Sequence, residues 1–160
     1  MKIEELTSVG KLTTIFAPNR NIAKSIKTEF LLDNKDTIIF DGNVSLMSLE
    51  FSIKQTDKFI IFEYDSIDLT KIELRNFIRS VLNMGQRHSL SVICILNSNY
   101  NDERKPRYYN TFMYMSSYSI NVSFITEKLF FEVKVLKNRK TTKPLKEYVT
   151  PQINLFENCE

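Results

Sequence analysis

LTTIFAPNRNIAKSIKTEFLL, residues 12–32, is the stretch that decides the fold. Residues 11–17 are mostly apolar or β-branched and predict a buried strand. After a short polar segment, apolar residues recur at every fourth position, as on one side of a helix, with Asn21 as its N-cap. These apolar positions are Ile22, Ile26 and Phe30. The stretch therefore predicts a strand, a loop and a helix.

Lys24 and Ser25 are expected to open this helix, where the lysine and hydroxyl of a phosphate-binding loop stand. The pattern of such a loop is G-x-x-x-x-G-K-[ST], because glycine lets backbone N–H groups curl closely around phosphate. Pro18 and Ala23 occupy the two glycine positions here. Proline has no N–H to donate, and alanine disfavours positive φ. The sequence thus predicts an impaired phosphate loop; the alternative is an ordinary strand–helix unit.

Composition fits one domain with a real core, since 42% of the 160 residues are hydrophobic and 26% are charged. The absence of an apolar run of about 18 residues and the acidic N-terminal segment favour a soluble, intracellular protein with no membrane partner. The two cysteines, Cys94 and Cys159, offer neither a disulfide framework nor a metal-binding pair, so no metal site is expected. The sequence places no acid and nucleophile beside His88, so no catalytic residue is predicted.

The rest of the chain alternates strand and helix patterns. Short apolar runs predict strands at residues 37–41, 58–62 and 90–96, and runs apolar on both faces are typical of a parallel sheet. Thr70 and Glu73 form a capping box for an amphipathic helix that is expected to stop at Gly85. Residues 46–53 fit a helix or a strand, and helix is preferred. Alternation around residues 120–124 and 129–136 predicts an antiparallel hairpin.

This order of motifs resembles the RecA/RadA/KaiC superfamily of P-loop ATPase cores: AKS at a helix start, IIFD, FIIFEYDS, SVICILN and finally VLKNRKTTKP. The resemblance implies an α/β RecA-like fold, a mostly parallel sheet flanked by helices with a C-terminal antiparallel hairpin. Residues 1–146 are expected to form this core and residues 147–160 a C-terminal tail.

The resemblance also implies a vestigial nucleotide site at Lys24, Ser25, Asp65 and Asn97. Asp65, or alternatively Glu63, matches the acid that holds Mg²⁺, and Asn97 matches the polar residue that senses the γ-phosphate. Asn43 stands where the superfamily has its catalytic glutamate, and an amide cannot accept a proton from water. We therefore expect no hydrolysis and no cofactor, beyond residual ATP and Mg²⁺ binding.

In recombinases of this superfamily the loop after the fourth strand contacts single-stranded DNA. That loop here carries cations and tyrosines, which suit phosphates and stacked bases; the alternative is a solvated loop that happens to contain tyrosines. Residues 134–146 form a basic stripe that contains no acid, and this stripe is a second candidate for contact with DNA. The alternative interpretation is a solvated strand edge. The candidate DNA-binding residues are Arg104, Lys105, Arg107, Tyr108, Tyr109, Lys137, Arg139 and Lys140.

The tail resembles the peptide by which bacterial repair proteins dock on the sliding clamp, through Gln152, Leu155 and Phe156. The alternative is a tail folded onto its own core. Together these features predict a non-catalytic accessory protein of DNA recombination or repair. Its partners would be single-stranded or duplex DNA and a recombinase, a paralogue subunit or the clamp. An ATP-binding regulator with an atypical loop, and a protein-interaction subunit without DNA affinity, are the two alternatives.

Overall fold

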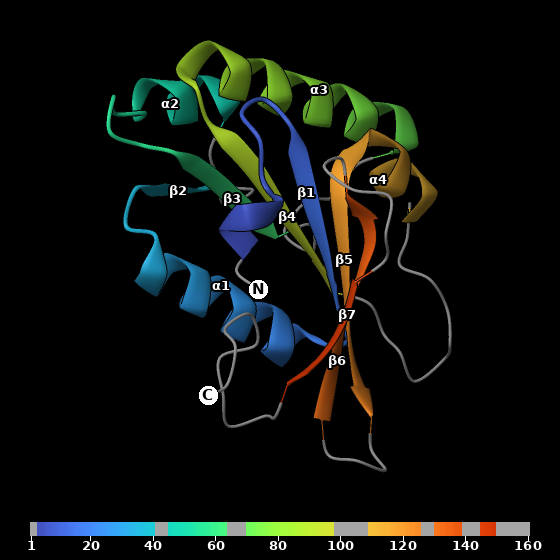
Figure 1. The fold of residues 1–160 in the computed structure, drawn as a ribbon. Coiled ribbons are helices and arrows are strands. Elements are labelled where there is room, and N and C mark those ends of the chain that lie inside the picture. Colours follow the sequence, from blue (N-terminus) through green and yellow to red (C-terminus); the bar gives the residue numbers. More distant parts are fainter. Residues whose placement is uncertain are drawn as a thin grey trace.

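The computed structural model describes residues 3–40, 45–63, 70–97, 109–125, 130–138 and 145–149. Helices and strands alternate through most of this chain (Figure 1). The elements are η1 (Ile3–Leu6), β1 (Leu12–Ala17), α1 (Arg20–Asp33), β2 (Thr37–Phe40), α2 (Leu46–Phe51), β3 (Phe59–Glu63), α3 (Lys71–His88), β4 (Ser91–Asn97), α4 (Tyr109–Met115), β5 (Ser116–Ile125), β6 (Phe130–Asn138) and β7 (Leu145–Val149).

The strands form one sheet in the order β2-β3-β4-β1-β5-β6-β7. Strands β2, β3, β4, β1 and β5 are parallel, and β6 and β7 add to β5 in antiparallel fashion. This arrangement confirms the expected α/β class and the antiparallel hairpin. The additional strand β7 was not expected, and it crosses the position where we placed the start of the tail. The boundary at residue 146 itself stays a prediction, because residues 150–160 lie outside the described chain.

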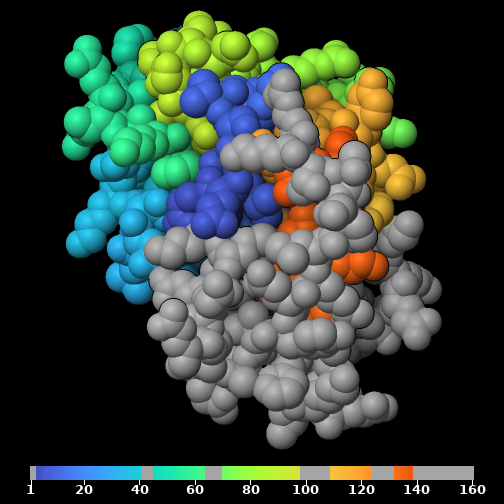
Figure 2. All heavy atoms as spheres, viewed as in Figure 1, coloured from blue at the N-terminus to red at the C-terminus, as the bar shows by residue number. Residues whose placement is uncertain are grey.

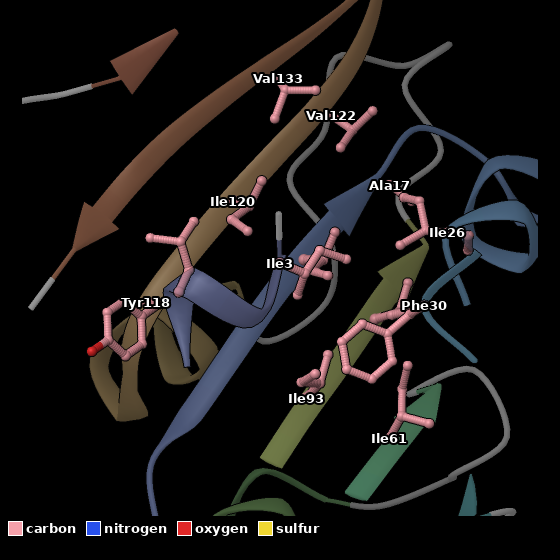
Figure 3. Close-up of a cluster of buried hydrophobic side chains, with 14 of the residues drawn as sticks. Ile3, Ala17, Ile26, Phe30, Ile61, Ile93, Tyr118, Ile120, Val122 and Val133 are labelled. Carbon is pink, nitrogen blue, oxygen red and sulfur yellow. The ribbon is translucent and has the colours of Figure 1, made fainter. Parts of the chain in front are cut away.

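Helices cover both faces of the sheet (Figure 1). η1 and α1 pack on one face, and α2, α3 and α4 pack on the other. All six residues of β1, which lies between β4 and β5, are buried, as expected for a central strand covered on both sides. Figure 3 shows the cluster on the α1 face, where Ile3 of η1 reaches the sheet beside Ile120, and Phe30 of α1 lies near Ile61 and Ile93.

Helix α1 begins at Arg20, because Asn19 caps it. Asn19 has an extended backbone (φ −158°, ψ 173°), and its Oδ1 accepts a hydrogen bond from Ile22 N at 2.9 Å. The prediction that Asn21 is the cap was wrong, since Asn21 lies inside the first turn. Ile26 and Phe30 are buried against the sheet and Ile22 is half-buried, so the predicted inward face is correct.

Helix α3 has the predicted capping box but continues past Gly85 to His88. Thr70 N donates to Glu73 Oε2 at 2.8 Å, and Glu73 N donates to Thr70 Oγ1 at 3.3 Å. The helix ends at Ser89, which adopts the left-handed conformation (φ 57°). Gly85 serves packing instead, since a Cβ there would lie 3.0 Å from Leu90 O and 3.2 Å from Val92 Cγ2.

Two short helices complete the face that carries α3. α2 confirms the preferred helical reading of residues 46–53. α4 was missed, because YNTFMYM has no clear period and we expected a loop as far as residue 110. Its buried residues are Thr111 and Phe112, so contact with the core and not local sequence preference supports this helix. Among the described residues, no helix is long and apolar enough to cross a membrane.

Candidate functional site

The connection between β1 and α1 consists of Pro18 and Asn19 alone. The residues that follow, which a phosphate loop would hold open around an anion, are already helical. Two of their N–H groups bond to the cap: Ile22 N donates to Asn19 Oδ1 at 2.9 Å, and Ala23 N donates to Asn19 O at 3.0 Å. The predicted loop is therefore largely the first turns of a capped helix.

Lys24 and Ser25 lie in the second turn of α1 and do not open it, which corrects the expected placement. Both are exposed, whereas Ala23, Ile26 and Phe30 bury the opposite face of the helix. Lys24 and Ser25 line a shallow hollow of about 450 Å³ together with Asn21, Thr28 and Glu29. This hollow lies on the solvent face of α1, so the pair faces away from the sheet.

The end of β3 carries an acid that is already paired. Lys27 of α1 places its Nζ 2.6 Å from Oε1 of Glu63, the last residue of β3. Both side chains are about three-quarters buried, at 27% and 24% exposure. Glu63 was the alternative to Asp65 as the Mg²⁺-binding acid. Asp65 and Asn43 lie outside the described residues.

Asn97 ends β4, the strand between β1 and β3. It is in register with Ala17, the last residue of β1, so it lies beside the start of the Pro18–Asn19 connection. Glu63 is in register with Ile95 one strand further along. The carboxyl edge of the sheet thus brings Asn97 and Glu63 to neighbouring strand ends, but Lys24 and Ser25 are not directed toward them.

Two of the predicted DNA-binding residues are described, and both lie at α4. Tyr109 begins this helix and packs its half-buried ring against Phe16, with centroids 4.8 Å apart. Lys137 of β6 is exposed and donates from Nζ to Met113 O, near the other end of the helix, at 3.1 Å. The remaining predicted residues, and the proposed clamp-binding residues, lie outside the described chain: Arg104, Lys105, Arg107, Tyr108, Arg139, Lys140, Gln152, Leu155 and Phe156.

A bulge in β6 explains why Lys137 reaches α4. Val135 is in register with Ile120 and Lys137 with Ser119, so Leu136 is the extra residue. Val135 belongs to the cluster under α1, and the extra residue turns Lys137 toward the opposite face. Simple alternation along the strand would have placed Val135 and Lys137 on the same face.

The fold has counterparts among solved structures. RadB recombinase superposes with a TM-score of 0.62 at 12% sequence identity, covering 92% of this chain and 91% of that one. The chain has a RecA-like fold. The flagellar accessory protein FlaH from Methanocaldococcus jannaschii matches with a TM-score of 0.53 at 14% identity, covering 87% of this chain and 85% of that one. No protein-family model and no curated protein sequence matches the chain.

The RecA-like core also carries a hollow to which the sequence assigned no role. It measures about 270 Å³ and lies between α3 and α4, lined by Lys71, Arg75, Asn110, Thr111 and Tyr114. The spacing of Lys71 and Arg75, one helical turn apart, was the only signal in the sequence. Without α4 in the predicted elements, nothing placed Tyr114 beside them. In the described part of the chain, no group of histidine, cysteine, aspartate and glutamate side chains is arranged to hold a metal ion.

Proposed function

We propose that this RecA-like protein is a non-catalytic accessory factor of DNA recombination or repair, which binds DNA and a protein partner without using ATP. The observation that carries the proposal is the two-residue connection between β1 and α1. A phosphate is held at such a position by free backbone N–H groups curled around it. Here the helix starts too early for that geometry, and Asn19 accepts bonds from two of the N–H groups.

The Lys27–Glu63 ion pair argues in the same direction. A Mg²⁺ ion at the end of β3 would need carboxylate oxygens, and the Lys27 ammonium lies 2.6 Å from one of them. Lys24 and Ser25 are exposed on α1, so they place neither their ammonium nor their hydroxyl group at the strand ends. These residues do not fit a bound Mg-ATP.

The DNA part of the proposal rests on α4 and its flanking segments. Tyr109 is the first residue of this helix, and Lys137 contacts the helix near its other end. The loop of residues 98–108, with its three cations and two tyrosines, leads directly into α4, and the basic stripe continues β6. Cations that neutralise phosphates and rings that stack on bases suit single-stranded DNA. One protein of similar fold is described as a recombinase, which agrees with this assignment.

The partner part of the proposal rests on the sequence. A recombinase or a paralogue subunit is the partner that a non-catalytic core of this fold suits best. Gln152, Leu155 and Phe156 fit the short extended peptide that docks on a sliding clamp, with two apolar side chains for a pocket and an amide for its rim.

The test is a titration of labelled single-stranded DNA at two salt concentrations with the wild type and two charge-matched variants. One variant replaces Arg104, Lys105 and Arg107 by Gln. The control replaces Lys35, Lys54 and Lys58 by Gln; these lysines are exposed before β2 and β3 at the amino edge of the sheet.

We expect salt-dependent binding by the wild type and by the control, and weaker binding with a smaller salt slope for the loop variant. Absence of DNA binding by the wild type would instead favour the interaction subunit. Equal binding by both variants would show that the loop assignment is wrong.

A further inference from the structure

The hollow between α3 and α4 combines two cations with an exposed ring. In Figure 1 the beginning of α3 lies beside α4, and Figure 2 shows green atoms of α3 adjoining orange atoms of α4 at the upper right. α3 contributes Lys71 and Arg75, and α4 contributes Asn110, Thr111 and Tyr114. The hollow therefore joins two elements that lie far apart in the sequence.

The packing of α4 determines which side chains line the hollow. Phe112 is fully buried and Thr111 is 7% exposed, so these two residues hold the helix on the core. Asn110 and Tyr114 are one turn apart on the other side and border α3. Tyr114 is 79% exposed, which leaves the faces of its ring free for a planar ligand.

The two cations of the hollow have no acid partner among the described residues. Elsewhere on this surface such pairs do form, for example between Arg87 and Glu50 at 2.6 Å. Glu73, the acid closest to Lys71 and Arg75 along α3, instead accepts a hydrogen bond from Thr70 N at 2.8 Å in the capping box. Within the described part of the chain, Lys71 and Arg75 are therefore available to an external anion.

We propose that this hollow binds one nucleotide unit of single-stranded DNA, an inference that rests on the DNA-binding function proposed above. The phosphate lies between Lys71 and Arg75, and the base stacks on Tyr114, with the Asn110 amide at its edge. Near the C-terminal end of α4, Lys137 supplies the cation for a neighbouring phosphate. The single-stranded DNA therefore runs across α4.

The exposed ring of Tyr114 is the reason for proposing single-stranded DNA as the ligand. A duplex offers phosphates to Lys71 and Arg75, but its bases are stacked on each other and cannot cover Tyr114. Loss of the ring should then weaken binding of a single strand and leave binding of a duplex nearly unchanged. Loss of the cations should weaken binding of both.

The experiment uses labelled oligo-thymidine and a duplex of equal length, each titrated at several salt concentrations. Tyr114→Ala is expected to weaken single-strand binding by about 5- to 150-fold, the range for one stacked base, while Tyr114→Phe keeps the wild-type affinity. The Lys71→Gln/Arg75→Gln double variant should reduce the salt slope by about 0.7 for each phosphate that the protein no longer neutralises. A Lys35→Gln/Lys54→Gln variant with the same net charge is the control.

Photocrosslinking to an oligonucleotide with bromouracil provides a second readout on the unaltered protein, and the crosslink is expected at Tyr114. The hollow is excluded if the wild type binds DNA, the loop variant of Arg104, Lys105 and Arg107 weakens binding, and neither the Tyr114 nor the Lys71/Arg75 variant does. That result leaves the proposed DNA function intact. Absence of any DNA binding by the wild type overturns both.

Discussion

The Nζ of Lys27 lies 2.6 Å from Oε1 of Glu63 and joins helix α1 to the end of strand β3. This pair lies at the edge of the sheet where Asn97 also ends its strand. A lysine of the same chain therefore contacts a carboxylate that the resemblance to P-loop ATPases offered to a metal ion.

Breaking this pair should destabilise the fold. Lys27→Met is expected to lower the free energy of unfolding by about 1–2 kcal/mol, at or above the upper end of the range of about 0.2–1 kcal/mol for exposed pairs, because both side chains are largely buried. Urea unfolding measures the change. The control is Lys58→Met, whose partner Asp36 lies 3.8 Å away and whose side chain is 71% exposed. Equal effects of the two variants would contradict the special role of the Lys27–Glu63 pair.

The position at which α1 begins can be tested by replacing Asn19 and Asn21 separately by alanine. Asn19→Ala removes the side-chain cap of Ile22 N and should cost about 1 kcal/mol of stability. Asn21→Ala lies inside the helix at an exposed position, so it should be neutral or slightly stabilising. Urea denaturation of both variants shows which of the two asparagines caps the helix. A larger loss for Asn21→Ala would mean that the helix starts later and the connection after β1 is longer than described.

Gly85 should resist replacement although it is helical. Gly85→Ala gains up to about 1 kcal/mol of helix propensity, but the new methyl meets the backbone oxygen of Leu90 at 3.0 Å. Since overpacking costs typically about 1–3 kcal/mol, we expect a net loss of stability. Asn76→Ala, at an exposed position of α3, serves as the control and should be neutral or stabilising. A stabilised Gly85→Ala would show that β4 can move away from α3.

Glu50 gives a pH dependence with a definite sign. The hydrogen bond from Arg87 is the main cause that holds the pKa of Glu50 below its ordinary value of 4.5, and His88 adds to it. A carboxyl with a lowered folded-state pKa stabilises the protein above its unfolded pKa, and this contribution is lost as the pH falls through the folded value. Wild type should therefore exceed Arg87→Gln in stability at pH 7, and the difference should shrink below pH 4.5. A difference that grows in acid would contradict this assignment.

Strands were predictable from the sequence because buried runs such as those around Ile61 and Ile93 are apolar on both faces. Each strand of the parallel core except β5 begins and ends within a residue of its expected position. Features that depend on tertiary contacts were not predictable. Gly85 suggested a helix end because its sequence signal is the same for a cap and for close packing. α4 and β7 acquire their structure from contacts with the core and with β6.

The candidate site was less predictable than the fold for a similar reason. A motif such as A-K-S fixes residue spacing but not where a helix begins, and the cap at Asn19 moved Lys24 and Ser25 into the second turn. The bulge at Leu136 that turns Lys137 to α4 leaves no mark in the alternation of the sequence. Lys71 and Tyr114 meet through the packing of two helices.

The most direct test of the central claim is a titration of labelled single-stranded DNA with and without Mg-ATP. The claim is that this RecA-like protein binds DNA without nucleotide, because its β1–α1 connection leaves no phosphate cradle. We predict salt-dependent binding with the same isotherm in both conditions. Binding that appears only with Mg-ATP would contradict the account and identify an ATP-binding regulator.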